Sequence, residues 1–147
     1  MLPITVVIAS TETSLAACLR LLRPEKRILV VAEARSDPEA IAAARLNPRI
    51  LLLDLSVSIR GGLAVLRAFR RDSPRTKVIL LTGRVAEARM LDVLSRGARG
   101  YLKWKALRPF LAKAVRLVDA GEAWVPRRMV AKLIERFALV TARAGRR

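Results

Sequence analysis

The chain has 147 residues, 53% of them hydrophobic, and its 29 Lys and Arg against 12 Asp and Glu give a formal net charge of +17. This length suits one domain with a short extension and needs no disulfide or metal to support its core. Histidine is absent, which excludes serine or cysteine triads with an imidazole base and most catalytic zinc sites. Cys18 is the only cysteine, so no intramolecular disulfide can form, and we expect a cytoplasmic protein.

The high positive charge does not by itself indicate a function. It would attract nucleic acid, an anionic membrane or an acidic partner. The basic residues are scattered through every segment, however, and no apolar stretch approaches the length that spans a membrane. The apolar N-terminus lacks a basic n-region, so we interpret it as a first strand and not as a signal peptide.

The first third of the chain predicts two strands, each followed by a helix. Residues 4–9 form an apolar run typical of a strand, and the next apolar residues follow helical spacing up to Pro24: Leu15, Cys18, Leu19 and Leu22. We expect Cys18 to pack in the core. Residues 28–32 are a β-branched run that predicts a second strand. Asp37-Pro38 indicates an N-cap and a first-turn proline for a helix that Asn47-Pro48 ends.

A third strand is predicted at residues 50–53, where four large aliphatic residues lead directly to Asp54. Such a run is typical of a strand that is buried on both faces. Gly61-Gly62 predicts a turn, and a helix then follows with one apolar face: Leu63, Leu66 and Phe69.

The next segment predicts two more strands and two more helices. Residues 78–81 read as a strand that ends at Thr82-Gly83, and residues 86–95 read as a helix that Gly97 caps. A short strand at residues 100–102 precedes the last helix of this series, whose apolar stripe runs from Leu107 to Val118 and which Gly121 closes.

The C-terminal segment predicts a sixth, amphipathic helix that begins at Pro126. Its apolar face carries Val130, Leu133, Ile134 and Phe137. We expect residues 141–147 to be a linker or a frayed end. The predicted organisation is therefore a domain of residues 1–122, followed by a C-terminal amphipathic helix and linker of residues 123–147.

Five strands that alternate with five helices predict an α/β fold with a doubly wound parallel sheet. Right-handed crossovers place the ends of the first, third and fourth strands at one edge, where such sheets bind ligands. We therefore expect Ser10, Thr11, Asp54 and Thr82 to gather there. Asp54 could be a phosphate acceptor, a metal ligand or a simple strand terminator.

Four motifs carry a resemblance to a known family: VVIAS, ILLLDLSVSIRGG, VILLTG and GARGYLKW. In this order and at these separations they resemble the receiver domain of bacterial two-component response regulators. The match is best to the NarL/FixJ (LuxR-type) branch, over roughly residues 4–120. The resemblance implies a flavodoxin-like (receiver) sheet of five strands with five helices, to which the C-terminal helix would be appended.

The resemblance also implies roles for individual residues. Asp54 matches the phosphoacceptor that takes a phosphoryl group from a kinase histidine, and it would also be a ligand of the family's Mg²⁺. Thr82 matches the hydroxyl that contacts the phosphoryl group, and Tyr101 matches the switch aromatic. Gly62 matches a turn glycine eight residues beyond the aspartate.

Three positions depart from the family pattern. Ser10 and Thr11 stand where the family has two acids that hold Mg²⁺, and Trp104 stands where it has a phosphate-binding lysine. Hydroxyls are poor substitutes for carboxylates around Mg²⁺. We therefore expect an atypical, pseudo-receiver-like domain with weak or no phosphorylation and weak or no Mg²⁺ binding.

Each of these residues also has an alternative interpretation as a purely structural residue. Ser10 and Thr11 could be an N-cap pair for the first helix. Tyr101 could be an ordinary strand aromatic. Trp104 could pack over the mouth of the site or anchor an interface.

We expect signal transduction by a receiver of a LuxR-type transcriptional regulator, which would act by changing association and not as an enzyme. Partners would be a sensor histidine kinase or another regulatory protein, and a second copy through the fourth helix, fifth strand and fifth helix or through the C-terminal helix. DNA would be contacted only by a helix-turn-helix output domain, which is absent up to Arg147. The alternative is a stand-alone basic adaptor that binds nucleic acid or an acidic protein; a small α/β hydrolase has little support.

Overall fold

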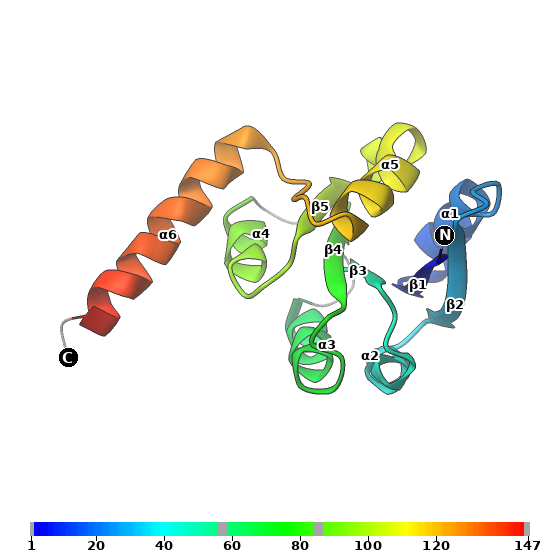
Figure 1. The fold of residues 1–147 in the computed structure, drawn as a ribbon, viewed down its shortest axis with the longest axis horizontal. Helices are drawn as coiled ribbons and strands as arrows, with labels where there is room; N and C mark the ends of the chain where they lie inside the picture. Colours follow the sequence, from blue (N-terminus) through cyan, green and yellow to red (C-terminus); the bar gives the residue numbers. More distant parts are fainter. Residues whose placement is uncertain (1, 56–58, 84–86, 146–147) are drawn as a thin grey trace.

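A single parallel sheet with helices on both faces forms the body of the computed structural model, which describes residues 2–55, 59–83 and 87–145 (Figure 1). The strand order is β2-β1-β3-β4-β5. The strands are β1 Ile4–Ala9, β2 Ile28–Ala34, β3 Ile50–Asp54, β4 Lys77–Thr82 and β5 Gly100–Lys103. The α-helices are α1 Glu12–Leu22, α2 Asp37–Ala43, α3 Ile59–Asp72, α4 Glu87–Leu94, α5 Leu107–Asp119 and α6 Arg127–Gly145. Two 3₁₀ turns, η1 Ala44–Leu46 and η2 Trp104–Ala106, extend α2 and precede α5. The predicted flavodoxin-like architecture is confirmed.

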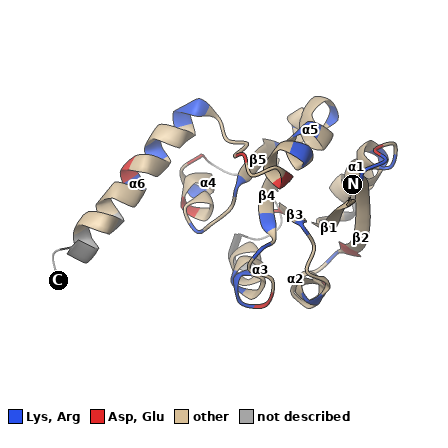
Figure 2. Cartoon of the chain, in the orientation of Figure 1, with Lys and Arg blue, Asp and Glu red and all other residues tan. Residues whose placement is uncertain are grey.

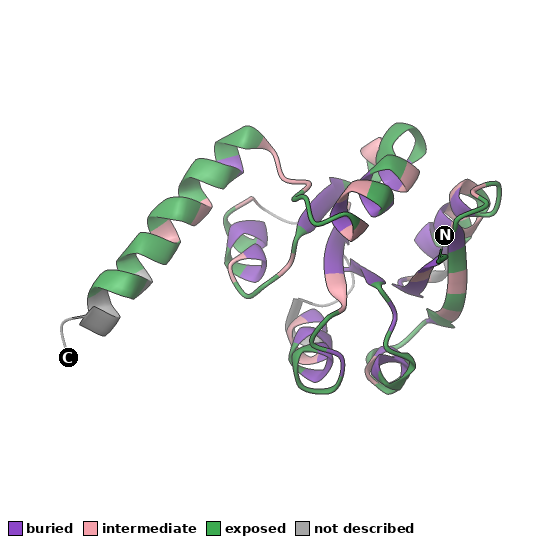
Figure 3. Cartoon of the chain, viewed as in Figure 1, coloured by how far each residue is buried: buried purple, intermediate pink, exposed green. Residues whose placement is uncertain are grey.

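The sheet separates two hydrophobic cores, because successive strand residues point to opposite faces. One core packs Leu51, Leu53 and Leu80 against α2, α3 and α4. The other packs Ile8, Leu52 and Leu81 against α1 and α5. All five residues of β3 are buried (Figure 3), as expected for a strand that is covered on both sides.

Cys18 lies in the second core and is fully buried, which confirms its predicted packing role. Burial and, to a smaller extent, the negative charge of Asp54 together raise the pKa of this thiol to about 12. The thiol therefore stays protonated at neutral pH and is a poor nucleophile.

Two predicted local features are wrong in a way that the contacts explain. Gly61-Gly62 does not form a turn, because α3 already begins at Ile59. At Gly62 an added Cβ would lie 2.1 Å from a Leu55 methyl carbon, so glycine is needed there for close packing inside the helix. The N-cap of α2 is Ser36, and not Asp37, since the Ser36 hydroxyl accepts a hydrogen bond from the Glu39 backbone N–H at 3.3 Å.

The predicted linker at residues 141–147 is also wrong in part, because α6 continues through Gly145. Ala142 and Ala144 favour a helix, and no proline interrupts this segment. The last two residues lie outside the described part of the chain. No helix of the described segments is both long enough and apolar enough to cross a bilayer.

Helix α6 lies beside α4 at one end of the molecule (Figure 1). Met129 is fully buried in the first core, and Leu133 packs against the same core. Three ion pairs join the two helices: Arg128 to Glu87 at 2.9 Å, Lys132 to Glu87 at 3.4 Å, and Arg136 to Asp92 at 3.1 Å.

Only part of the expected apolar face of α6 packs on the body of the molecule: Leu133 does, and the other three members lie outside the contact. Val130, Ile134 and Phe137 are 39%, 63% and 51% exposed, and Leu139 is exposed as well. Basic side chains and Met129 instead contact α4, so the helix retains an apolar stripe that no described residue covers. We call Val130, Ile134 and Phe137 the α6 stripe.

The segment before α6 covers the outer edge of β5. Gly100 and Trp124 form a parallel bridge. The Tyr101 N–H donates to the Trp124 carbonyl at 2.8 Å, and the Trp124 N–H donates to the Arg99 carbonyl at 3.0 Å. The edge of β5 is thus protected from pairing with another strand at this point.

The contact between α4 and α6 can be tested with Met129→Ala. Truncating a fully buried methionine should lower the free energy of unfolding by about 2 kcal/mol or more. The control is Glu135→Ala, at an exposed position of the same helix outside the α6 stripe, which should change it by less than about 0.5 kcal/mol. Urea unfolding measures both, and equal losses would show that α6 does not pack on the core through Met129.

Candidate functional site

The candidate site lies at the C-terminal edge of the sheet, where β1, β3 and β4 end next to one another. Ala9 is the register partner of Leu53, and Asp54 is the register partner of Leu81. Ser10 follows Ala9, and Thr82 follows Leu81, so both lie one residue beyond the partners of β3. The sequence prediction that these residues gather at one edge is therefore confirmed by the strand register.

The Asp54 carboxylate is held by two serine hydroxyls. Asp54 is only 8% exposed. Its Oδ2 accepts a hydrogen bond from Ser10 Oγ at 3.0 Å and one from Ser14 Oγ at 2.8 Å. The two hydroxyls are also in hydrogen-bonding contact with each other, so two hydroxyl protons serve three contacts.

Ser14 is a site residue that the sequence reasoning missed. It lies one helical turn after Ser10 and four residues before Cys18, on the buried side of α1, and is itself buried. The sequence does contain a signal for it, because Ser14 lies next to Leu15 and on the same helical face as Cys18, which was predicted to be buried. A serine there must either find a partner or bear a desolvation cost.

The N-cap interpretation of Ser10 and Thr11 is wrong. Thr11 occupies the N-cap position of α1, but its side chain makes no capping hydrogen bond. The Ser10 hydroxyl contacts Asp54 and Ser14 instead. The pair therefore does not satisfy the first N–H groups of the helix, and Ser10 is a neighbour of the carboxylate.

Thr82 and Tyr101 are both buried. Thr82 is the last residue of β4 and pairs in register with Lys103. Tyr101 lies in the core that faces α4. Burial raises the pKa of its phenol, the negative charge of Glu87 raises it further, and the positive charge of Arg128 lowers it. The phenol is therefore neutral and close to the charged start of α4.

Trp104 packs directly on the residue that follows Thr82. A Cβ added to Gly83 would lie 2.8 Å from Cε3 of the Trp104 ring, so the ring lies against the Gly83 backbone. Trp104 is still 39% exposed, while Lys103 and Lys105 on either side are exposed. The structure thus agrees with a packing role for Trp104 at the mouth of the site and leaves part of the ring accessible.

The residues around Asp54 do not fit a resident magnesium ion. Mg²⁺ prefers carboxylate oxygens, and Oδ2 of Asp54 is already engaged by two hydroxyl donors. Among the residues that the structure describes, no three His, Cys, Asp or Glu side chains come together in a way that could hold a metal.

Comparisons with known proteins match this fold and chain to one family. The model of the response regulator receiver domain matches residues 6–116. The response regulator UvrY of Escherichia coli K12 is 32% identical over 111 residues, which cover 75% of this chain and 51% of UvrY. The chain thus spans about half the length of the curated relatives it matches.

Solved structures show the same fold. A LuxR-family two-component response regulator from Aurantimonas sp. SI85-9A1 has a TM-score of 0.77 at 22% identity, covering 92% of this chain and 99% of that one. The signal receiver domain of the response regulator NarL from Mycobacterium tuberculosis has a TM-score of 0.74 at 25% identity, covering 83% and 100%. These relatives agree with the predicted resemblance to the NarL/FixJ (LuxR-type) branch, and the chain belongs to the response regulator receiver domain family.

Proposed function

We propose that this chain is an atypical receiver that acts in a LuxR-type transcriptional regulator and signals by changing its association with other proteins. The observation that carries the proposal is the Asp54 carboxylate, which is buried and bound by the hydroxyls of Ser10 and Ser14. In this proposal Asp54 keeps the phosphoacceptor position but is weakly phosphorylated or not phosphorylated. Thr82 and Tyr101 keep the positions of the phosphoryl contact and the switch aromatic.

The chemistry of phosphoryl transfer supports weak activity. Such transfer is accelerated mainly by positioning and by cancelling the negative charge that develops on the phosphoryl oxygens. The positions that resemble the family's metal acids carry Ser10 and Thr11, and the position of its phosphate-binding lysine carries Trp104. The two serine hydroxyls also compete for the lone pairs with which Asp54 would attack phosphorus.

The partners follow from the same proposal. The chain would act in the cytoplasm downstream of a sensor histidine kinase or another regulatory protein, with no chemistry on a substrate. The relatives are about twice as long as the stretch that matches. DNA would accordingly be contacted by a separate output domain and not by the receiver domain of residues 1–122.

A second copy of the chain is the partner we propose for the α6 stripe, which belongs to the C-terminal segment of residues 123–147. Of the two expected surfaces for self-association, the one formed by α4, β5 and α5 is partly occupied within the chain. Helix α6 covers α4, and Trp124 covers the edge of β5. The stripe has the i, i+4, i+7 spacing with which helices pair.

The loss of phosphorylation is tested with magnesium and a small phosphodonor such as acetyl phosphate, with intact mass as the readout. We expect fewer than about a tenth of the chains to be labelled, because each missing charge-stabilising group costs about tenfold or more. A variant that restores the family pattern, Ser10→Asp with Thr11→Asp and Trp104→Lys, should gain at least about tenfold in labelling rate.

The matched control for added charge is Thr13→Asp with Ala16→Asp, at two exposed positions of α1, and it should stay unlabelled. Asp54→Asn in the restored variant should abolish the signal. Stoichiometric labelling of Asp54 in the natural sequence would overturn the proposal.

The role of Ser14 is tested by Ser14→Ala. Loss of one donor to a buried carboxylate should lower the free energy of unfolding by about 1–3 kcal/mol at neutral pH. Thr13→Ala, on the exposed side of the same turn, should cost less than about 0.5 kcal/mol. The cost of Ser14→Ala should shrink in an Asp54→Asn background; an unchanged cost would show that Ser14 stabilises something other than the charge.

Self-association is tested by measuring the molar mass against concentration in sedimentation or light scattering. We expect the mass to rise toward that of a dimer, and Ile134→Ser with Phe137→Ser to hold the chain as a monomer. The control, Leu29→Ser with Val31→Ser, removes two exposed apolar residues from β2 and should leave the dimer intact. If the variant with Ile134→Ser and Phe137→Ser still forms a dimer, the α6 stripe is not the interface.

A further inference from the structure

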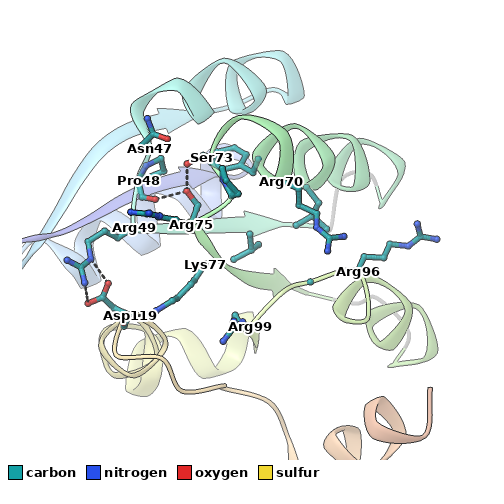
Figure 4. Close-up of a pocket in the computed structure, with 16 residues that line it drawn as sticks. Asn47, Pro48, Arg49, Arg70, Ser73, Arg75, Lys77, Arg96, Arg99 and Asp119 are labelled. Atoms are coloured by element: carbon teal, nitrogen blue, oxygen red, sulfur yellow. Dashed lines mark hydrogen bonds and ion pairs between the residues drawn. The ribbon is translucent and has the colours of Figure 1, made fainter. Parts of the chain in front are cut away.

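A large basic hollow lies at the N-terminal edge of the sheet, at the opposite end of the strands from Asp54 (Figure 4). It has a volume of about 1160 Å³. The segments that lead into β3, β4 and β5 line it together with the ends of α3 and α4. Six of its lining residues are cations: Arg49, Arg70, Arg75, Lys77, Arg96 and Arg99. Asp119 is the one acid among the described lining residues.

Two of these cations already have a hydrogen-bond partner within the fold, and one of them is paired with a carboxylate. Arg49 binds the Asp119 carboxylate with two hydrogen bonds, of 2.7 and 3.1 Å. Lys77 Nζ donates to the Asp119 backbone carbonyl at 3.0 Å. Both contacts lie at the same side of the hollow, so the single carboxylate is used up there.

The remaining four arginines have little or no compensation. Arg96 lies 3.9 Å from Asp92 in an exposed pair, which contributes little. Within the described part of the chain, Arg70, Arg75 and Arg99 form no ion pair with a carboxylate. The Arg70 guanidinium lies against Gly97, whose φ of +117° and missing Cβ leave room for it. Like charges gathered around one concavity repel each other, and an anion in that concavity would relieve the repulsion.

Helix ends explain only part of this cluster. Arg70 lies in the last turn of α3 and Arg96 lies just after α4, where cations offset the negative end of the helix dipole. Arg75 and Arg99 do not belong to a helix terminus, since they precede β4 and β5. An even distribution of basic residues along the sequence does not explain the cluster either. Most of the exposed residues that line the hollow are cationic.

The chemistry of the lining suits phosphate groups. Five of the six cations are arginines, whose planar forks match phosphate oxygens in pairs. In Figure 4, Arg49 and Arg75 lie at one end of the hollow, where Lys77 reaches Asp119, Arg70 and Arg96 lie at the other end, and Arg99 lies between the two ends. Cations at both ends of a hollow of about 1160 Å³ suit a ligand that carries more than one phosphate group.

The shape favours a small ligand over nucleic acid. Arg70, Arg75 and Arg99 lie around a concave space, whereas a duplex needs cations on a surface that can follow its backbone. The apolar floor of Leu66, Phe69 and Val78 is buried, so the described lining offers no exposed aromatic ring on which bases could stack. We propose that this hollow binds a small anion that carries two or more phosphate groups, at a site separate from Asp54.

The test uses the whole chain with sodium tripolyphosphate as the probe, orthophosphate as the single-phosphate comparison, and a short DNA duplex as the nucleic-acid arm. Calorimetry at physiological salt should show saturable binding of tripolyphosphate at least about tenfold tighter than that of orthophosphate. Arg75→Gln with Arg99→Gln should weaken tripolyphosphate binding at least about tenfold, since it removes two forks from the hollow.

The matched control is Arg20→Gln with Arg108→Gln, which removes the same charge from exposed positions of α1 and α5. Its affinity should stay within about twofold of the natural chain. Equal weakening by both pairs would show general attraction to net charge and overturn the site, as would absence of binding. Duplex DNA that binds more tightly than tripolyphosphate and depends on Arg75 and Arg99 would overturn the small-ligand proposal in favour of nucleic acid.

Discussion

The burial of β3 on both faces is the constraint on which the rest of the molecule depends. Helices must cover each side of a strand that has no polar side chain before its last residue, and this sets the two cores and the helices that close them. Because of the same constraint, the only charged residue of β3 is its last one, Asp54, at the edge of the sheet. A carboxylate there is close enough to the core to be buried and close enough to the edge to meet α1.

The position of Asp54 then determines what its neighbours can do. A buried carboxylate needs donors; Ser10 supplies one from the segment after β1, and Ser14 supplies one from α1. The same negative charge adds to burial in raising the pKa of Cys18. The carboxylate at the edge of the sheet is thus hydrogen-bonded by side chains of the same domain. Figure 2 shows Lys and Arg spread over α6, other helices and the loops.

The sequence predicted the strands, most helix ends and the place of Asp54 because these follow from local periodicity. Apolar runs mark the strands, and glycines with positive φ close α4 and α5 at Gly97 and Gly121. Ser14 was missed because its role depends on a strand 40 residues away. The face with which α6 packs was predicted only at Leu133, since Met129 and the ion pairs with α4 also determine it and a helical wheel does not show ion pairs. The cations of the basic hollow are likewise brought together by strand order alone.

Glu87 ties the C-terminal helix to the interior of the receiver. It binds Arg128 and Lys132 of α6, which hold its own pKa below the usual range, and its charge acts on the buried phenol of Tyr101. Removing α6 would take away the two cations that compensate this carboxylate. The affinity of α6 for the body and the preferred environment of Tyr101 are therefore coupled, and the coupling is reciprocal. A protein that captures α6 would change the electrostatics at β5, and a rearrangement at β5 would change how readily α6 can be captured.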